Sequence, residues 1–378
     1  MPCGKIETND MRIAILTLPF NINYGGIIQN YALQTFLRQM GHEVETINLK
    51  KILLFKRYDV SFLSRMFGTG KSGSRKQVHK FINEHISLTA PFYNKKDFLR
   101  YDFSRFDAVV VGSDQVWRLR YAYPDIYTYY LDFIKDEAFY GKKIRKIAFS
   151  ASFGIDEAEY TDEQRKLCAG YIKDFDLVTV REKSALRLIN DVYGWRCSIP
   201  PIQMPDPTML LGKDDYLRVS SHADDAADNG GLFCYILDMT DEKRSIIDRM
   251  AADLGVRPFT VRRRSHKWYA SSDARMVPSP EEWLRAFSRA SYVFTDSFHG
   301  SVFSLIFQKP FIAIGNRKRG LERFHSLFGK FGLDDRLIYD INGYTPDLMK
   351  KQIDWSEVAA IFDEDRKRAA DCLSSVLY

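Results

Sequence analysis

The chain has 378 residues, of which 45% are hydrophobic and 28% are charged. This length is too great for one ordinary hydrophobic core, so we expect about two domains in a globular protein. The net charge is +6, from 55 basic and 49 acidic residues. Such a modest excess suits an anionic small substrate, an anionic membrane surface or neither, and it is too weak to indicate nucleic-acid binding.

Cysteine usage and apolar runs give the expected location. The five cysteines are scattered, odd in number and without a CxxC pair, so neither a zinc site nor a disulfide framework is indicated. The first ten residues lack the apolar stretch of a signal peptide, and no run approaches the roughly 20 apolar residues of a membrane span. We expect a cytoplasmic protein, either free or at the inner face of the membrane.

The first half of the chain alternates short apolar runs with helical patterns. A helix with apolar residues at helical spacing follows the first run and ends at Gly41. Thr161 and Gln164 have the spacing of a capping box and predict the start of another helix. The alternation predicts a parallel sheet in a Rossmann-like domain, with strands at 11–17, 43–48, 107–112, 146–150 and 177–180.

Ligands of parallel sheets collect beyond the carboxyl ends of the strands, so the residues that follow each strand are site candidates. The loop after the first strand carries Asn23, Gly25 and Gly26, and its glycines allow backbone to approach a ligand closely. These glycines do not form the G-x-G-x-x-G pattern, so dinucleotide binding is not supported. The stretch 68–72 imitates a phosphate-binding P-loop, but Arg65 stands where that motif needs its first glycine.

A polar turn follows the strand 107–112, with Ser113, Asp114, Gln115 and Trp117. A carboxylate, an amide and an indole suit the hydroxyl groups and the face of a sugar. Alternatively, Asp114 caps a helix and Trp117 packs inside the domain.

Two further positions in the first half leave a choice open. After the strand 177–180, Arg181 could clamp a carboxylate or phosphate through a bidentate fork, or form an ion pair with Glu182 or a neighbouring acid. Asp206 lies between two prolines, in a proline-dense stretch that is expected to connect the domains. There a turn is the simpler interpretation.

The second half repeats the alternation, with predicted strands at 232–237, 259–261, 292–294 and 311–314. The stretch 295–300 (Thr-Asp-Ser-Phe-His-Gly) joins a buried strand to a helix, which places His299 at a helix N-terminus. Alternatively, His299 only stabilises the turn and has no part in a site. After the last of these strands, Arg317, Lys318 and Arg323 form a cationic loop that is either a phosphate pocket or a solvated surface.

The predicted fold is therefore α/β, with two Rossmann-like domains. The N-terminal domain spans 11–202 and the C-terminal domain spans 203–354. A terminal helix at 355–376 is expected to pack back on the first domain.

Five motifs together resemble the polysaccharide pyruvyltransferases: Asn-Tyr-Gly-Gly at 23–26, Val-Gly-Ser-Asp-Gln-Val-Trp at 111–117, Val-Arg-Glu-Lys-Ser at 180–184, Asp-Pro-Thr at 206–208, and the stretch 295–300. The resemblance implies a GT-B-like pair of domains facing across a cleft, with the acceptor on the N-terminal side and the donor on the C-terminal side. It implies transfer of pyruvate from phosphoenolpyruvate to a hydroxyl pair of a bacterial surface polysaccharide or its lipid-linked precursor, as a ketal. Phosphoenolpyruvate is the co-substrate, and no cofactor or metal is expected.

The resemblance also places site residues. His299 and Arg181 match positions that contact phosphoenolpyruvate, whereas several relatives carry arginine where this chain has Ser297. One of the cations 317, 318 and 323 could replace that guanidinium. The reaction requires an acid, a base and cations for the carboxylate and phosphate. His299 could donate the proton or bind the phosphate, and Asp296 and Asp114 are both candidate bases.

Two other functional classes remain open from the sequence. A nucleotide-sugar glycosyltransferase would share the GT-B-like architecture and would need an acidic residue for the ribose. A non-catalytic glycan-binding protein would keep Trp117 and would need no cationic pocket.

Overall fold

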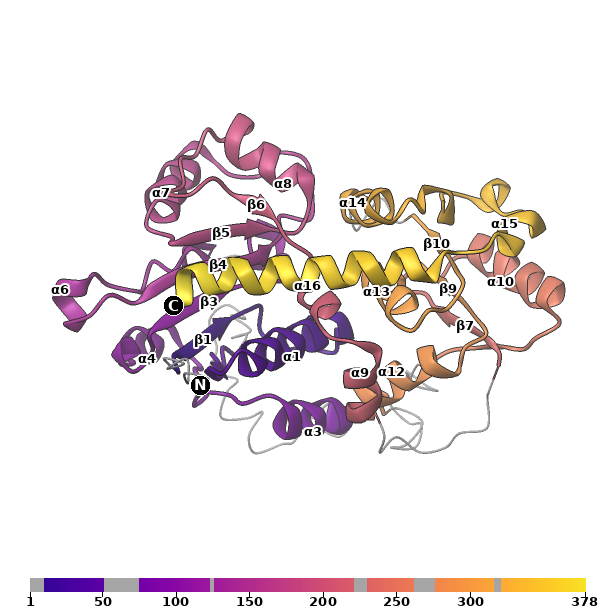
Figure 1. Ribbon diagram of the computed structural model, residues 1–378, viewed down its shortest axis with the longest axis horizontal. Helices are drawn as coiled ribbons and strands as arrows, with labels where there is room; N and C mark the ends of the chain where they lie inside the picture. The colour runs from indigo at the N-terminus through magenta and orange to yellow at the C-terminus, as the bar shows by residue number, and fades with distance from the viewer. Residues whose placement is uncertain (1–9, 51–74, 123–125, 221–229, 262–275, 316–320) are drawn as a thin grey trace, which may run out of the picture.

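The computed structural model contains two parallel β-sheets, each covered by helices (Figure 1). The predicted α/β class with two Rossmann-like sheets is confirmed. The stretch 68–72 lies outside the residues that the structure describes, which are 10–50, 75–122, 126–220, 230–261, 276–315 and 321–378.

The first sheet has the strand order β2-β1-β3-β4-β5-β6, and all its pairings are parallel. Its strands are β1 (Arg12–Leu16), β2 (Glu43–Thr46), β3 (Ala108–Val111), β4 (Arg145–Ala151), β5 (Leu177–Val180) and β6 (Ile202–Gln203). The strands β3 and β5 are buried along their whole length, which explains their continuous apolar sequences. The chain passes from β2 on one side of β1 to β3 on the other, so the topological switch point of this sheet lies between β1 and β3.

Helices cover this sheet on both faces. They are α1 (Tyr24–Gln39), α3 (Lys76–His85), α4 (Lys95–Leu99), α5 (Leu119–Ala122), α6 (Glu137–Tyr140), α7 (Asp162–Ile172) and α8 (Lys183–Arg187), with short helical turns η2 (Phe103–Arg105), η3 (Ile126–Tyr130) and η4 (Leu188–Val192). The predicted capping box at the start of α7 is confirmed, since the Thr161 and Gln164 side chains each accept from the other residue's backbone N–H. α1 ends at Gln39 with Met40 as its C-cap residue, and the predicted stop, Gly41, follows with a φ of +99°.

The second sheet has the strand order β11-β10-β9-β7-β8, again all parallel. Its strands are β7 (Leu232–Tyr235), β8 (Pro258–Phe259), β9 (Tyr292–Thr295), β10 (Phe311–Ile314) and β11 (Leu337–Ile338). Its helical segments are η5 (Pro207–Leu210), α9 (Lys213–Ser220), α10 (Asp241–Leu254), α12 (Pro280–Arg289), α13 (Phe298–Ile306), α14 (Glu322–Phe331), η7 (Asp334–Arg336), η8 (Ile341–Gly343), α15 (Pro346–Lys350) and α16 (Trp355–Leu377).

One apolar core joins the two halves of the molecule. It contains residues of α1 and α3 from the first half together with residues of α12, α13 and α16. At the junction, Tyr24 at the start of α1 stacks on Trp283 of α12 with 5.6 Å between ring centroids, and its hydroxyl donates to the carbonyl of Pro278 at 2.8 Å. This packing fixes the start of α1 against the second half of the chain.

The terminal helix α16 runs past both sheets (Figure 1). Near its start, Phe362 packs on Phe331 of α14. Further along, Arg368 donates to the carbonyl of Gln203 at the end of β6, and the Tyr378 hydroxyl donates to the carbonyl of Met40 after α1. Among the described residues, no helix combines the length and apolarity needed to cross a membrane.

Candidate active site

The side chain of Asp206 lies at the centre of a buried polar cluster. It follows β6 and is 1% exposed. One carboxylate oxygen, Oδ1, accepts from the backbone N–H and the hydroxyl of Thr208. The other, Oδ2, accepts from Arg181 Nη1 at 2.7 Å and from the Ser113 hydroxyl at 3.3 Å, and it lies 3.6 Å from His299 Nε2. Residues that follow β3, β5, β6 and β9 therefore converge on one carboxylate.

The charged side chains of this cluster shift one another's pKa values toward the charged forms. Burial alone would raise the pKa of Asp206, but the neighbouring His299 and Arg181 lower it well below its usual range. Burial would lower the pKa of Arg181, yet the carboxylates of Asp206 and Glu182 raise it. Asp206 is therefore a permanent carboxylate at neutral pH and is unsuited to donating a proton.

The His299 ring lies between the first turns of two helices. It is the second residue of α13, and it packs against the start of α1 so closely that a Cβ on Gly25 would lie 2.1 Å from His299 Nδ1. A Cβ on Gly26 would lie 3.2 Å from Asp114 Oδ2, which places that carboxylate beside the same turn. The two helix N-termini bring their positive dipole ends to one place, an arrangement that favours anions.

Two guanidinium groups contact the ring of Phe298. Arg181 Cζ lies 5.0 Å and Arg323 Cζ lies 5.4 Å from the ring centroid. Burial and the charge of Arg181 lower the pKa of Arg323 to about 10, so both groups are cationic at neutral pH. Within the described residues, Arg181 Nη2 is buried and has no hydrogen-bond partner. A buried N–H without an acceptor is costly, and an anionic ligand would satisfy it.

Comparisons with known proteins identify the family of the chain. The family model described as polysaccharide pyruvyl transferase matches residues 23–318. The chain belongs to this family. It is accordingly a transferase enzyme that acts in polysaccharide modification, and no curated protein sequence matches it.

Solved structures share the fold of this pyruvyl transferase family member. UDP-GlcNAc 2-epimerase from Methanocaldococcus jannaschii is 11% identical with a TM-score of 0.51, covering 97% of this chain and 100% of that chain. The glycotransferase of kitacinnamycin is 15% identical with a TM-score of 0.48, covering 98% of this chain and 99% of that chain. At these identities the likeness concerns the fold alone.

The sequence did not identify two members of the cluster as functional. The flanking prolines predict a turn at Asp206, and this residue does cap η5 (Pro207–Leu210) through Oδ1. Its second oxygen, Oδ2, accepts a hydrogen bond from Arg181. Glu182 is fully buried, and its Oε1 accepts from the Ser152 hydroxyl and from the N–H groups of Phe153 and Gly154, each at 2.9 Å. Both residues lie in motifs that carry the family resemblance, Glu182 at 180–184 and Asp206 at 206–208, and this is the feature of the sequence that could have identified them.

The face of the Trp117 indole is not accessible to a sugar, so that prediction is wrong. The indole has no exposed surface, stacks on Tyr130 with centroids 5.1 Å apart, and donates from Nε1 to the carbonyl of Tyr129. The alternative interpretation, that it packs inside the domain, holds. Gln115 is also buried, and its amide oxygen accepts from Arg118 and lies against Gly154.

The remaining predicted residues differ in their positions. Asp296 is 1% exposed, and its oxygens accept from Lys243 Nζ at 2.6 Å and from the N–H groups of Leu237 and Asp238. It thus joins β9 to the turn before α10. Ser297 caps α13 by accepting from the Gly300 N–H, and Asn23 is the exposed N-cap residue of α1. Arg317 and Lys318 lie outside the described residues.

Replacement of Gly25 by alanine should displace His299. The new Cβ would lie within 2.1 Å of His299 Nδ1, a distance that no non-bonded pair tolerates, so the ring must move away from Asp206. We expect the Gly25→Ala protein to fold but to lose activity, with a shifted His299 imidazole resonance in NMR spectra. Gly170→Ala is the matched control, because Gly170 is an exposed residue of helix α7 and a Cβ there meets nothing within 4 Å. An active Gly25→Ala protein with an unshifted resonance would contradict the described contact.

Replacement of Asp206 by asparagine should destabilise the protein by about 3 kcal/mol at neutral pH, because Arg181 would lose the nearer of its two buried counter-ions and keep only Glu182, at 3.8 Å. The folded-state pKa of Asp206 is depressed, so its stabilisation is present above the ordinary carboxylate pKa and is lost as the pH falls below it. The stability difference between the two proteins, measured by urea unfolding, should be constant above about pH 5 and should shrink below about pH 4.

The control is Asp174→Asn, since the side chain of Asp174 is 65% exposed and its loss should change stability by no more than about 0.5 kcal/mol. A difference that already declines between about pH 8 and 6 would assign the titration to a histidine instead of Asp206.

Proposed function

We propose that the enzyme transfers pyruvate from phosphoenolpyruvate to a pair of hydroxyl groups on a bacterial surface polysaccharide or its lipid-linked precursor, forming a pyruvate ketal. The observation that carries this proposal is the buried Arg181, which is held by Asp206 through one nitrogen while another N–H group lacks a partner within the described structure. Membership of the pyruvyl transferase family supports the same reaction. The predicted cytoplasmic location, free or at the inner face of the membrane, remains a prediction.

The donor would be bound through its two anionic groups. Phosphoenolpyruvate carries a carboxylate and a phosphate, and the cluster offers the cations Arg181 and Arg323 beside the first turns of α1 and α13. The unpaired Nη2 of Arg181 suits one oxygen of either group. In this proposal Arg323, which contacts the same Phe298 ring as Arg181, supplies the guanidinium that several relatives carry at the position of Ser297.

His299 would supply the proton. Its Nε2 lies 3.6 Å from the carboxylate of Asp206, within the cluster where the donor would be bound. Transfer of this proton to the terminal vinyl carbon makes a methyl group and leaves an oxocarbenium-like centre at the neighbouring carbon. A sugar hydroxyl gives its proton to a carboxylate base as its oxygen bonds to that carbon, and phosphate leaves with the C–O electron pair. The second hydroxyl then bonds to the same carbon and gives its proton to the departed phosphate, which closes the ketal.

Asp114 is the better placed base for the sugar hydroxyl. Both oxygens of Asp296 already accept hydrogen bonds from Lys243 and two backbone N–H groups. Asp114 Oδ1 accepts only from the N–H of Gln115 among the described contacts, and Oδ2 points toward the start of α1 beside the cluster. In this proposal the acceptor lies on the side of the first sheet, the side that the family resemblance implies.

Calorimetric titration with phosphoenolpyruvate, in parallel with a panel of nucleotide sugars, tests the proposal. Arg181→Lys keeps the charge but loses the planar fork, so the affinity for phosphoenolpyruvate should fall by roughly tenfold or more. His299→Gln should retain donor binding and lose turnover, which is measured by phosphate release with a saccharide acceptor.

The control is Arg187→Ala, an exposed arginine of helix α8, which should bind the donor like the natural protein. Binding of a nucleotide sugar without binding of phosphoenolpyruvate would instead establish glycosyl transfer.

A further inference from the structure

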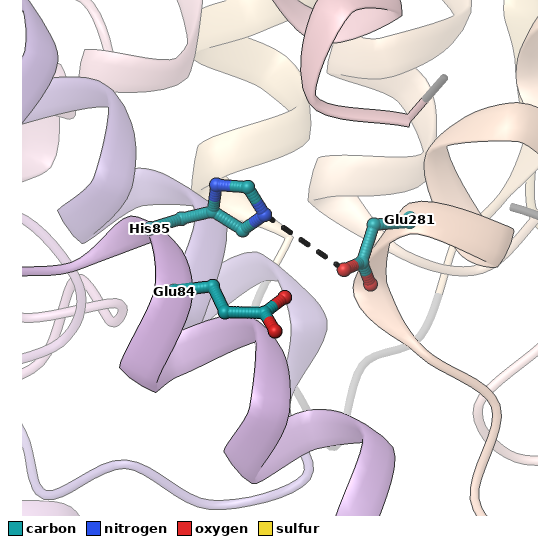
Figure 2. A group of neighbouring side chains, drawn as sticks. All are labelled: Glu84, His85 and Glu281. Carbon is teal, nitrogen blue, oxygen red and sulfur yellow. Dashed lines mark ion pairs between the residues drawn. The ribbon is translucent and has the colours of Figure 1, made fainter. Parts of the chain in front are cut away.

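A second group of polar side chains lies where α3 meets α12, and it shares no residue with the Asp206 cluster. Figure 2 shows Glu84 and His85, from the end of α3, pointing toward Glu281 in the first turn of α12. One ligand atom from each of the three side chains lies within 4.8 Å of the other two. The two carboxylates and the imidazole therefore face a common point between the two halves of the molecule.

The packing around His85 directs its ring. The imidazole lies 4.7 Å from the Phe81 ring and 6.2 Å from the Tyr31 ring, centroid to centroid. This leaves Nε2 at 3.9 Å from Glu281 Oε1, a separation that is too long for a hydrogen bond. The ring is thus held near the carboxylate without contacting it directly.

Glu281 provides an independent indication of a ligand. Its side chain is 13% exposed, and within the described structure its buried Oε2 has no hydrogen-bond partner. A carboxylate oxygen removed from water without a donor is unfavourable, and a cation at the common point would satisfy it. The side chain of Glu84 is 51% exposed, which leaves the point open to an ion from solvent.

We propose that Glu84, His85 and Glu281 bind a divalent transition-metal ion, with Zn²⁺ as the best match. Imidazole and carboxylate are ordinary zinc ligands at about 2.0–2.2 Å, and water commonly completes the tetrahedron. An ion with such bonds holds its ligand atoms about 3.4 Å apart. The 3.9 Å between His85 Nε2 and Glu281 Oε1 is about 0.5 Å longer than that value, so binding of the ion would draw these two side chains together.

The position of this site indicates a structural role. α3 belongs to the first half of the chain, whereas α12 leads into β9, and His299 follows β9. An ion bound by both helices would cross-link the two halves next to the shared apolar core. It would thereby hold the element that carries His299 against the start of α1.

Calorimetric titration of the chelator-stripped full-length protein with ZnCl₂ tests the proposal, together with thermal unfolding. We expect one ion per chain and a melting temperature that rises with free Zn²⁺. His85→Gln and Glu281→Gln should each weaken binding by at least about tenfold. His79→Gln is the matched control, because this exposed histidine of α3 lies outside the group and its loss should leave binding unchanged. Co²⁺ bound to the natural protein should give the strong visible absorption of a tetrahedral site, which both variants should lose.

Three results would overturn the proposal. The stripped natural protein could fail to bind Zn²⁺ saturably. Both variants could bind Zn²⁺ as tightly as the natural protein, which would place the ion elsewhere, for example at a cysteine. Finally, both variants could lower the melting temperature equally with and without Zn²⁺, which would reduce the contact to an ion pair between His85 and Glu281.

Discussion

The site depends on the buried ion pair between Arg181 and Asp206. The two side chains lie 2.7 Å apart and are almost fully removed from water. Burial of two such charges costs several kcal/mol per ion before their attraction is counted, so an ion pair of this kind is a poor source of stability. Its value lies in geometry, because the carboxylate accepts from groups that follow β3 and β5 and holds the histidine of α13 at the same point. A hydrophobic pair of the same volume would fill the space without directing any of these groups.

The close contact between α1 and α13 is the second constraint. Since the His299 ring occupies the space that a side chain at position 25 would need, the two helices meet with their positive ends together. Two like dipole ends repel, and the Asp206 carboxylate beside them offsets part of that repulsion. The stacking of Tyr24 on Trp283 then fixes the approach from outside the cluster. An anionic ligand would complete this balance of charge.

Sequence patterns predicted the fold and the edge at which the site lies. Apolar runs identified most strands, and the strand-end rule selected Ser113, Asp114, Arg181 and His299, which the fold brings together. The prolines on either side of Asp206 predict only a turn. Its role in the cluster could not be predicted, because its partner Ser113 lies 93 residues earlier in the chain.

Orientation and distant pairing account for the other differences. An indole after a strand can face solvent or the core with the same sequence, and Trp117 faces the core. Asp296 is occupied by Lys243 from a helix of the same half, and the group around His85 joins two helices whose residues no local spacing connects.

The departure at Ser297 follows from how helix starts are stabilised. A serine at the N-cap position accepts from the Gly300 N–H and contributes about 1 kcal/mol to the helix, whereas an arginine there offers no acceptor. In the proposed function, Arg323 of α14 takes the place of the guanidinium that several relatives carry at this position, and it contacts the Phe298 ring that Arg181 also contacts. Each guanidinium can interact with the π-system of this ring, which belongs to the first residue of α13. The candidate site thereby combines a capped α13 with two cations that share the side chain of Phe298 as a neighbour.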